Sequence, residues 1–190
     1  MKLGTRPRFI RGNALERAIV SPVLRTGRLI LRPYRMDDAE RWYEIQSSPD
    51  VRSYTSWPDR TSAESRSHLK HRTQHVVLKQ ADDFLALAIE FNGELVGDLG
   101  LHLRSVSPST RFAEISWILH PDSYGQGLAA EAATAMMQFA FAKVHVRWLV
   151  AIIDPANTAS IALATGLGFT QLDSVEGALT FVASKPPNDN

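Results

Sequence analysis

The stretch HPDSYGQGLAAEAATAMM, residues 120–137, imposes a strand-to-helix turn on the chain. Gly125 and Gly127 stand one residue apart, an alternating apolar segment precedes them at 111–119, and a helical pattern follows directly. Glycine adopts backbone conformations closed to other residues and brings no side chain to the turn. The first N–H groups of a helix have no partner inside it, so they are open to an anion that the helix dipole also attracts. The turn is therefore a candidate phosphate cradle.

The common nucleotide motifs do not fit this turn. A Walker motif ends in Gly-Lys-Ser/Thr, whereas the chain has Gly127, Leu128 and Ala129 there, with no lysine for a γ-phosphate and no hydroxyl for magnesium. The dinucleotide fingerprint tolerates Ala130 in place of its third glycine, but the order of the preceding strands does not match it. Taken alone, the glycine pair fits a pyrophosphate site and a tight turn without a ligand equally well.

Composition narrows the class of protein. The 190 residues suffice for one domain with a full core. The 21 basic and 20 acidic side chains give no electrostatic case for binding nucleic acid or an anionic membrane. Without any cysteine, the chain has no disulfide framework, no thiolate nucleophile and no cysteine-based zinc site. No apolar run reaches the length of a transmembrane helix.

The two ends of the chain differ in composition from its middle. Residues 1–22 are rich in arginine with Glu16 as their single acid, which fits either a transit peptide or a disordered or loosely packed extension. The last residues are polar and proline-rich, as solvated tails are. We therefore predict a basic extension at 1–22, one domain at 23–184 and a flexible tail at 185–190.

Local patterns predict a mixed α/β domain. Thr61 and Glu64 form a capping-box pattern, Asn92 and Gly93 suit a tight hairpin turn, and Asn157 is a natural helix N-cap. Helices are predicted at 36–48, 61–80, directly behind the glycine turn, and 157–169. Strands are predicted at 28–34, at 111–119, at 146–153, as a pair within 84–103, and as two short segments around Glu176-Gly177.

Four segments, in this order, resemble the GNAT superfamily of acyl-CoA-dependent N-acetyltransferases, specifically its RimJ/RimL-like branch. They are TGRLILRPYRMDDAERWYEI, GELVGDLGL, AEISWILHPDSYGQGLAAEA and NTASIALATGLGF, and the resemblance covers about residues 24–183. It implies a strongly bent, mostly antiparallel mixed sheet flanked by helices in a single domain. It also implies acetyl-CoA as the co-substrate and no requirement for a metal.

The resemblance assigns a use to the glycine turn. In the family the coenzyme A pyrophosphate lies on backbone N–H groups of this turn, which are here those of Tyr124, Gly125, Gln126, Gly127, Leu128 and Ala129. The pantetheine arm pairs like an added strand with the end of the preceding strand, which is here Trp117, Ile118 and Leu119. The N–H of Leu119 would donate to the thioester carbonyl. Two departures stand out: Tyr124 occupies a position where Gln or Arg is frequent in the superfamily, and Trp117 replaces a usual tyrosine.

Acetyl transfer to an amine requires a base, because free amines are protonated near neutral pH. Glu114 is the candidate, since it lies on the strand that runs into the turn and shares a face with Phe112 and Ile118, which predicts partial desolvation and a raised pKa. It could take the proton directly or through water. The alternative is a structural glutamate that pairs with Arg104 or Arg111.

Three further residues complete the predicted site. By resemblance, Ser160 corresponds to a serine that can protonate or hydrogen-bond the leaving sulfur, and the alternative is a helix-start serine that satisfies local backbone. Asn157 would contact the pantetheine amides as well as cap its helix. Trp57 lies in a loop that borders the acceptor pocket in relatives, and core packing explains it equally well. His68, His71 and His75 share one helix face, but a metal stripe there has no acid to complete it.

The interpretation that unites these features is a soluble, cytoplasmic N-acetyltransferase that joins acetyl-CoA and a primary amine in a direct ternary complex. The acceptor is either a protein N-terminus or a small-molecule amine, and both monomer and homodimer remain open. The main alternative is a non-catalytic acyl-CoA-binding sensor that kept the cradle and lost turnover. A nucleotide-binding protein is disfavoured because the lysine and the magnesium ligands are missing.

Overall fold

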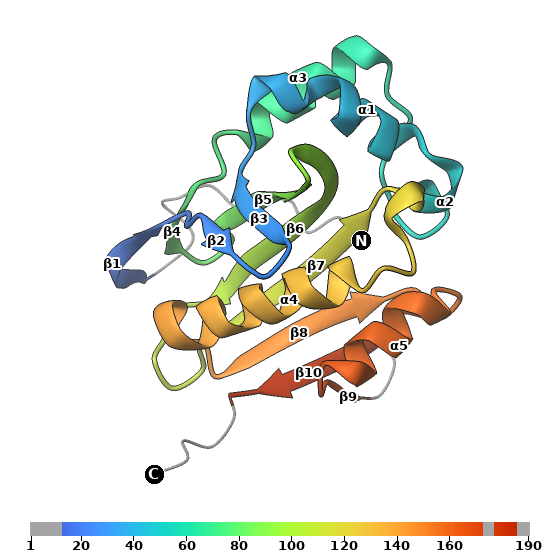
Figure 1. The fold of residues 1–190 in the computed structure, drawn as a ribbon. Coiled ribbons are helices and arrows are strands. Elements are labelled where there is room, and N and C mark those ends of the chain that lie inside the picture. The colour runs from blue at the N-terminus through green and yellow to red at the C-terminus, as the bar shows by residue number, and fades with distance from the viewer. Residues whose placement is uncertain (1–12, 173–176, 186–190) are drawn as a thin grey trace.

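A computed structural model describes residues 13–172 and 177–185 of the chain. Its centre is one eight-stranded sheet with the strand order β2-β3-β5-β6-β7-β8-β10-β9 (Figure 1). Every neighbouring pair is antiparallel except β7 and β8, which run parallel. The strands are β2 (Leu24–Arg25), β3 (Leu29–Pro33), β5 (Phe84–Phe91), β6 (Glu94–Ser105), β7 (Phe112–Leu119), β8 (Trp148–Ile153), β9 (Thr170–Gln171) and β10 (Leu179–Ser184). The mixed, mostly antiparallel sheet agrees with the predicted fold class.

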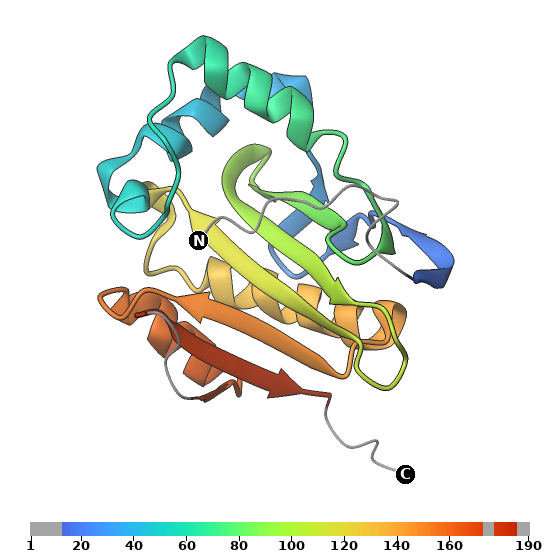
Figure 2. The ribbon, with the colours of Figure 1, turned by 180° about the vertical axis from the view of Figure 1, so that it is seen from behind.

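Different helices cover the two faces of the sheet. Helix α4 (Leu128–Phe139) packs on one face, where the main core combines its apolar side chains with alternate residues of β5. A second buried cluster on the opposite face joins other alternate β5 residues to α1 (Ala39–Ser47) and α3 (Ser62–Arg72). This alternation follows from the period of two in a strand. Helix α5 (Thr158–Gly166) contacts β8 and β9, and the short α2 (Pro49–Arg52) follows α1. Figure 2 shows the sheet from behind.

Most of the predicted caps and turns are present. Thr61 and Glu64 form both bonds of the capping box at α3. Asn92 and Gly93 join β5 to β6 with positive φ at both residues, 52° and 85°, as the hairpin turn requires. Asn157 caps α5 by accepting a hydrogen bond from the N–H of Ser160. The two short strands predicted near the end of the chain are β9 and β10, while Glu176 between them lies outside the described residues.

The predicted helix over 61–80 was wrong in its second half. Helix α3 ends at Arg72, and β4 (Val77–Gln80) follows it. Strand β4 pairs antiparallel with β1 (Ala14–Val20), and Leu78 at their junction is completely buried. The local sequence gives no sign of this pairing, because the partner strand lies in the arginine-rich first 22 residues, where no regular structure was predicted.

Strands β7 and β8 separate after a short parallel contact. Their pairing covers Phe112–Glu114 on β7 and Trp148–Val150 on β8, and it stops there. Beyond that point Ile115–Leu119 and Ala151–Ile153 both line a cavity. The sheet therefore opens into a wedge at the end where β7 enters the glycine turn, and we call this opening the β7/β8 wedge.

Candidate active site

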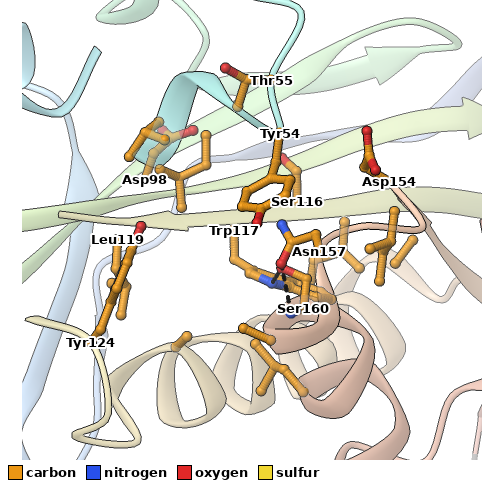
Figure 3. Close-up of a pocket in the computed structure, with 18 of the residues that line it drawn as sticks. Tyr54, Thr55, Asp98, Ser116, Trp117, Leu119, Tyr124, Asp154, Asn157 and Ser160 are labelled. Carbon is orange, nitrogen blue, oxygen red and sulfur yellow. Dashed lines mark hydrogen bonds between the residues drawn. The ribbon is translucent and has the colours of Figure 1, made fainter. Parts of the chain in front are cut away.

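One cavity of about 700 Å³ joins the β7/β8 wedge, the glycine turn and the loop after α2. Figure 3 shows Tyr54 and Thr55 from that loop on one side and Asn157 and Ser160 from α5 on the other. Trp117 lies between them on β7. All the residues predicted for the cofactor site line this cavity except Gln126, and so do Glu114 and Trp57. Residues predicted from separate sequence segments are therefore brought together in space.

The glycine turn has the backbone that the sequence predicted. Gly125 and Gly127 have φ values of 71° and 72°, in the left-handed region that strongly favours glycine. Gly127 is the N-cap of α4, and the first helical N–H with an acceptor is that of Glu131, which bonds to the Gly127 carbonyl. Within the described residues, no partner occurs for the N–H groups of residues 125–130. Unpaired N–H groups at a helix N-terminus suit a phosphate oxygen.

The N–H of Tyr124 differs from the rest of the predicted cradle. It donates to the carbonyl of Pro121 at 3.0 Å and closes the short helical turn that precedes the glycines. The phenol of Tyr124 remains half exposed at the cavity wall. Partial burial and the nearby Asp50 raise its pKa, so the phenol is neutral at physiological pH. Tyr124 therefore offers the cavity a side chain rather than a free amide.

Arg28 braces the outer side of the glycine turn. Its Nη1 donates to the carbonyl of Gln126 at 2.9 Å, and its Nε pairs with the Glu131 carboxylate at 2.7 Å. Glu131 also accepts from the backbone N–H of Arg28 and from the hydroxyl of Thr26. These contacts lower the pKa of Glu131. The Glu131 carboxylate thus ties the turn between β2 and β3 to the first turn of α4, and Arg28 holds the glycine turn from outside the cavity.

Glu114 lies on the cavity wall and also forms an ion pair. Both Nε and Nη2 of Arg104 donate to its Oε2, at 3.0 and 2.7 Å. The predicted alternative partner, Arg111, instead donates to the carbonyls of Val106 and Val144. The side chain of Glu114 is 25% exposed to solvent. Its Oε1 has no hydrogen-bond donor among the described residues, so the pairing with Arg104 leaves one carboxylate oxygen without a partner there.

Ser160 sits at the start of α5 in contact with β7. Its backbone N–H donates to Oδ1 of Asn157 at 3.0 Å, and the indole Nε1 of Trp117 donates to its Oγ at 3.3 Å (Figure 3). The cap predicted for Asn157 is present. Trp117, Asn157 and Ser160 all line the cavity. Trp117 on β7 and Ser160 on α5 therefore meet there from opposite sides of the wedge.

A buried ionic network forms the floor of the other end of the cavity. Asp98 on β6 accepts from Arg72 of α3 and, at 2.8 Å, from the hydroxyl of Tyr34. Burial, together with the negative charge of Asp98, raises the pKa of Tyr34 well above its ordinary value. The Arg72 guanidinium lies 4.9 Å from the ring centroid of Trp42. Sequence reasoning missed this network, since its members lie far apart in the chain and match no short motif.

Trp57 lies at the cavity wall and also takes part in core packing, so its acceptor-pocket role stays a prediction. It lines the cavity, and its ring packs edge-on against Trp42 with the centroids 5.5 Å apart. The prediction that His68, His71 and His75 share one helix face was wrong for His75, because α3 ends at Arg72 and His75 lies beyond it. His68 contacts Gln46, and His71 contacts His75. The described residues contain no group of three or more side chains arranged to hold a metal ion, and none of the described helices could span a membrane.

Comparison with known proteins identifies the family. The model of the acetyltransferase (GNAT) domain matches residues 28–170. An N-acetyltransferase of Bacillus licheniformis named p20, itself uncharacterized, is 25% identical over 146 residues, which cover 77% of this chain and 81% of that protein. Spermidine N(1)-acetyltransferase of Escherichia coli K12 is 27% identical over 149 residues, covering 78% of this chain and 74% of that protein.

A solved structure agrees with the fold. The ribosomal L7/L12 alpha-N-protein acetyltransferase RimL, solved in complex with coenzyme A, superposes with a TM-score of 0.68 at 18% identity, covering 87% of this chain and 98% of that one. Because the family model spans most of the chain, the chain belongs to the GNAT acetyltransferase family and is an acyltransferase.

Proposed function

We propose that this GNAT acetyltransferase moves the acetyl group of acetyl-CoA to a primary amine by direct attack within a ternary complex. The observation that carries the proposal is that one cavity is lined by the glycine turn with its unpaired N–H groups, by the β7/β8 wedge and by Glu114. Cofactor and acceptor can therefore occupy one space. The chain contains no cysteine, which fits a reaction without a cysteinyl intermediate.

The cofactor would enter along the wedge. Its pyrophosphate would accept hydrogen bonds from N–H groups between Gly125 and Ala129, where glycine leaves room for the phosphate oxygens. Its pantetheine arm would lie along Trp117–Leu119, where β7 has lost its pairing with β8, and would take the place of a neighbouring strand. Asn157 would add a polar contact from α5. This arrangement would point the thioester toward Glu114 and Ser160.

Glu114 would serve as the base. The amine must lose a proton as it attacks, and a carboxylate within hydrogen-bond reach, directly or through one water, can accept it. Arg104 occupies only Oε2 of this carboxylate, so Oε1 can face the amine or the water. Ser160, at the other side of the thioester, would assist the departing sulfur. The N–H of Leu119 would stabilise the charge that develops on the carbonyl oxygen.

The acceptor would be an amine that arrives as a cation. Among the described lining residues, Asp50, Asp98, Glu114 and Asp154 are acidic and Arg72 is basic. The charged side chains of the lining are therefore mainly carboxylates, although Asp98 pairs with Arg72 and Glu114 with Arg104; the remaining negative charge attracts ammonium groups. One relative is a spermidine acetyltransferase, and the superposed RimL structure is that of a ribosomal alpha-N-protein acetyltransferase. We therefore propose a protein N-terminus or a small polyamine as the acceptor class.

A turnover assay tests the proposal directly. Thiol release from acetyl-CoA would be measured with N-terminal peptides, spermidine, amino acids and aminoglycosides, beside acetyl-CoA affinity by calorimetry. We expect release with one amine class and saturable acetyl-CoA binding. Tight acetyl-CoA binding without release for any amine would instead support the alternative of a non-catalytic acyl-CoA sensor. Absence of binding would reject both.

A pair of glycine variants tests the cradle. Gly127→Glu places a carboxylate beside the proposed pyrophosphate, so we expect acetyl-CoA affinity to fall by about tenfold or more. Gly93→Glu is the matched control, because Gly93 also has positive φ, at 85°, and has open space around it in the β5–β6 turn. It adds the same charge and similar backbone strain away from the cavity. Equal affinities in the two variants would show that the turn does not bind the pyrophosphate.

A further inference from the structure

Trp117 bridges the two sides of the wedge at the proposed reaction centre. It lies on the part of β7 that has no partner on β8, and its indole Nε1 donates to Oγ of Ser160 on α5 at 3.3 Å. The rest of its side chain packs against the main core. A packed ring with a single polar atom is a rigid donor, so the indole fixes the direction from which Ser160 receives a hydrogen bond.

The chemistry of the two groups makes this contact directional. An indole N–H can only donate, while a serine hydroxyl has one hydrogen to donate and two lone pairs to accept. The bond from Trp117 therefore occupies a lone pair of Ser160 Oγ and cannot use its hydrogen. The hydroxyl hydrogen is directed elsewhere as a result.

Ser160 also lacks the local acceptor that other helical hydroxyls of this protein use. Ser47, Thr134 and Thr165 each donate to the backbone carbonyl four residues earlier, as hydroxyls in helices commonly do. Ser160 makes no such bond within the described residues, and its backbone N–H is already paired with Asn157. Its hydrogen thus remains for a group inside the cavity that it lines.

We propose that Trp117 is a positioning residue that aims the Ser160 hydroxyl hydrogen at the leaving sulfur. This inference rests on the proposed function. In the reaction the amine nitrogen bonds to the carbonyl carbon, and the C=O π pair moves to oxygen. When the intermediate collapses, the electron pair on oxygen re-forms the C=O bond, the C–S bond breaks, and its electron pair leaves with sulfur, which takes the Ser160 proton. Ser160 then regains a proton from water, and the proton that the amine gave to the base neutralises the hydroxide so formed.

The replacement Trp117→Phe tests the inference, because it removes the N–H and retains an aromatic ring for packing. We expect kcat to fall about five- to tenfold with KM for acetyl-CoA within about twofold, since the ring still packs. The rate would be measured both with the acceptor found in the panel and with hydroxylamine as the amine. The uncatalysed rate of the hydroxylamine reaction would be subtracted from the measured rate. Trp148→Phe is the matched control: Trp148 is partly exposed on β8 and does not line the cavity.

A double-mutant cycle separates this inference from the proposed function. If Trp117 acts through Ser160, Trp117→Phe has no further effect on kcat in a Ser160→Ala background. If Ser160→Ala alone keeps wild-type kcat, the leaving-group role in the proposed function fails, and the inference fails with it. If Ser160→Ala is slow but Trp117→Phe matches the wild type, only the inference is overturned.

Nuclear magnetic resonance supplies a readout that does not depend on turnover. The indole N–H signal of Trp117 is identified as the one missing from the Trp117→Phe spectrum. We expect Ser160→Ala to shift it upfield, because its hydrogen-bond acceptor is gone, and Ser160→Thr to restore it. An unchanged signal in Ser160→Ala would show that the bond does not form, which overturns the inference whatever the kinetics.

Discussion

The replacement Asp98→Ala should be among the most destabilising single changes in this domain. Asp98 and Arg72 keep only 4% and 8% of their side-chain exposure and form a direct ion pair. The arginine lies over the rings of Tyr34, Trp42 and Phe84 at 4.9 to 5.4 Å. Removal of the carboxylate leaves a buried cation without its counter-ion.

The expected magnitude follows from that burial. Loss of one partner of a buried ion pair costs about 3–5 kcal/mol, and the hydroxyl of Tyr34 loses its acceptor as well. We therefore expect the free energy of unfolding, measured by urea denaturation, to fall by about 4 kcal/mol. The control is Glu44→Ala, which breaks the pair between Arg41 and Glu44 with exposures of 29% and 46%. That change should cost at most about 1 kcal/mol.

A double variant keeps the prediction testable if Asp98→Ala fails to fold. Arg72→Met with Asp98→Leu removes both charges, and such replacements of buried pairs are often neutral or stabilising. We expect the double variant to be more stable than Asp98→Ala. The reasoning would be refuted if Asp98→Ala cost no more than Glu44→Ala, or if the double variant were less stable than Asp98→Ala.

Two further predictions concern catalysis and pH. Glu114→Gln should lower kcat by about a hundredfold with unchanged acetyl-CoA affinity. The control Glu94→Gln, at an exposed end of β6, should leave kcat unchanged. A loss of only a few-fold in Glu114→Gln would contradict the assignment of Glu114 as the base. Burial, with the charge of neighbouring cationic groups, lowers the pKa of His68 from 6.5 to about 4. As pH falls, the unfolded chain binds a proton at this histidine before the folded chain does. The contribution of His68 to the free energy of unfolding is therefore fully present above about pH 6.5 and is lost as pH falls toward 4. The slope of unfolding free energy against pH should flatten in His68→Gln, and an identical slope would contradict the burial argument.

The glycine turn and the helix cap at the proposed cofactor end could be predicted because their signals are local. The positive φ of Gly125 and Gly127 and the cap at Asn157 each depend on a few neighbouring residues, and the structure has them as predicted. The buried ionic network at the other end of the cavity could not be predicted in the same way. Asp98 and Arg72 meet only after α3 has packed over the sheet, and nothing in their local sequence distinguishes them from surface charges. The same reason explains β4, since its partner β1 lies about sixty residues earlier in the chain.

The position of the site follows from the one parallel pair in the described sheet. A parallel neighbour requires a crossover, and α4 supplies it between β7 and β8. Because the two strands run in the same direction, both carboxyl ends reach the same edge, and α4 and α5 both begin there. Their N-termini carry the unpaired N–H groups of the glycine turn and the Asn157 cap. The antiparallel strands on either side reverse direction and cannot place two helix N-termini together, so the β7/β8 junction is the one in the described sheet that brings two helix N-termini to one edge, which supports the proposed cofactor site.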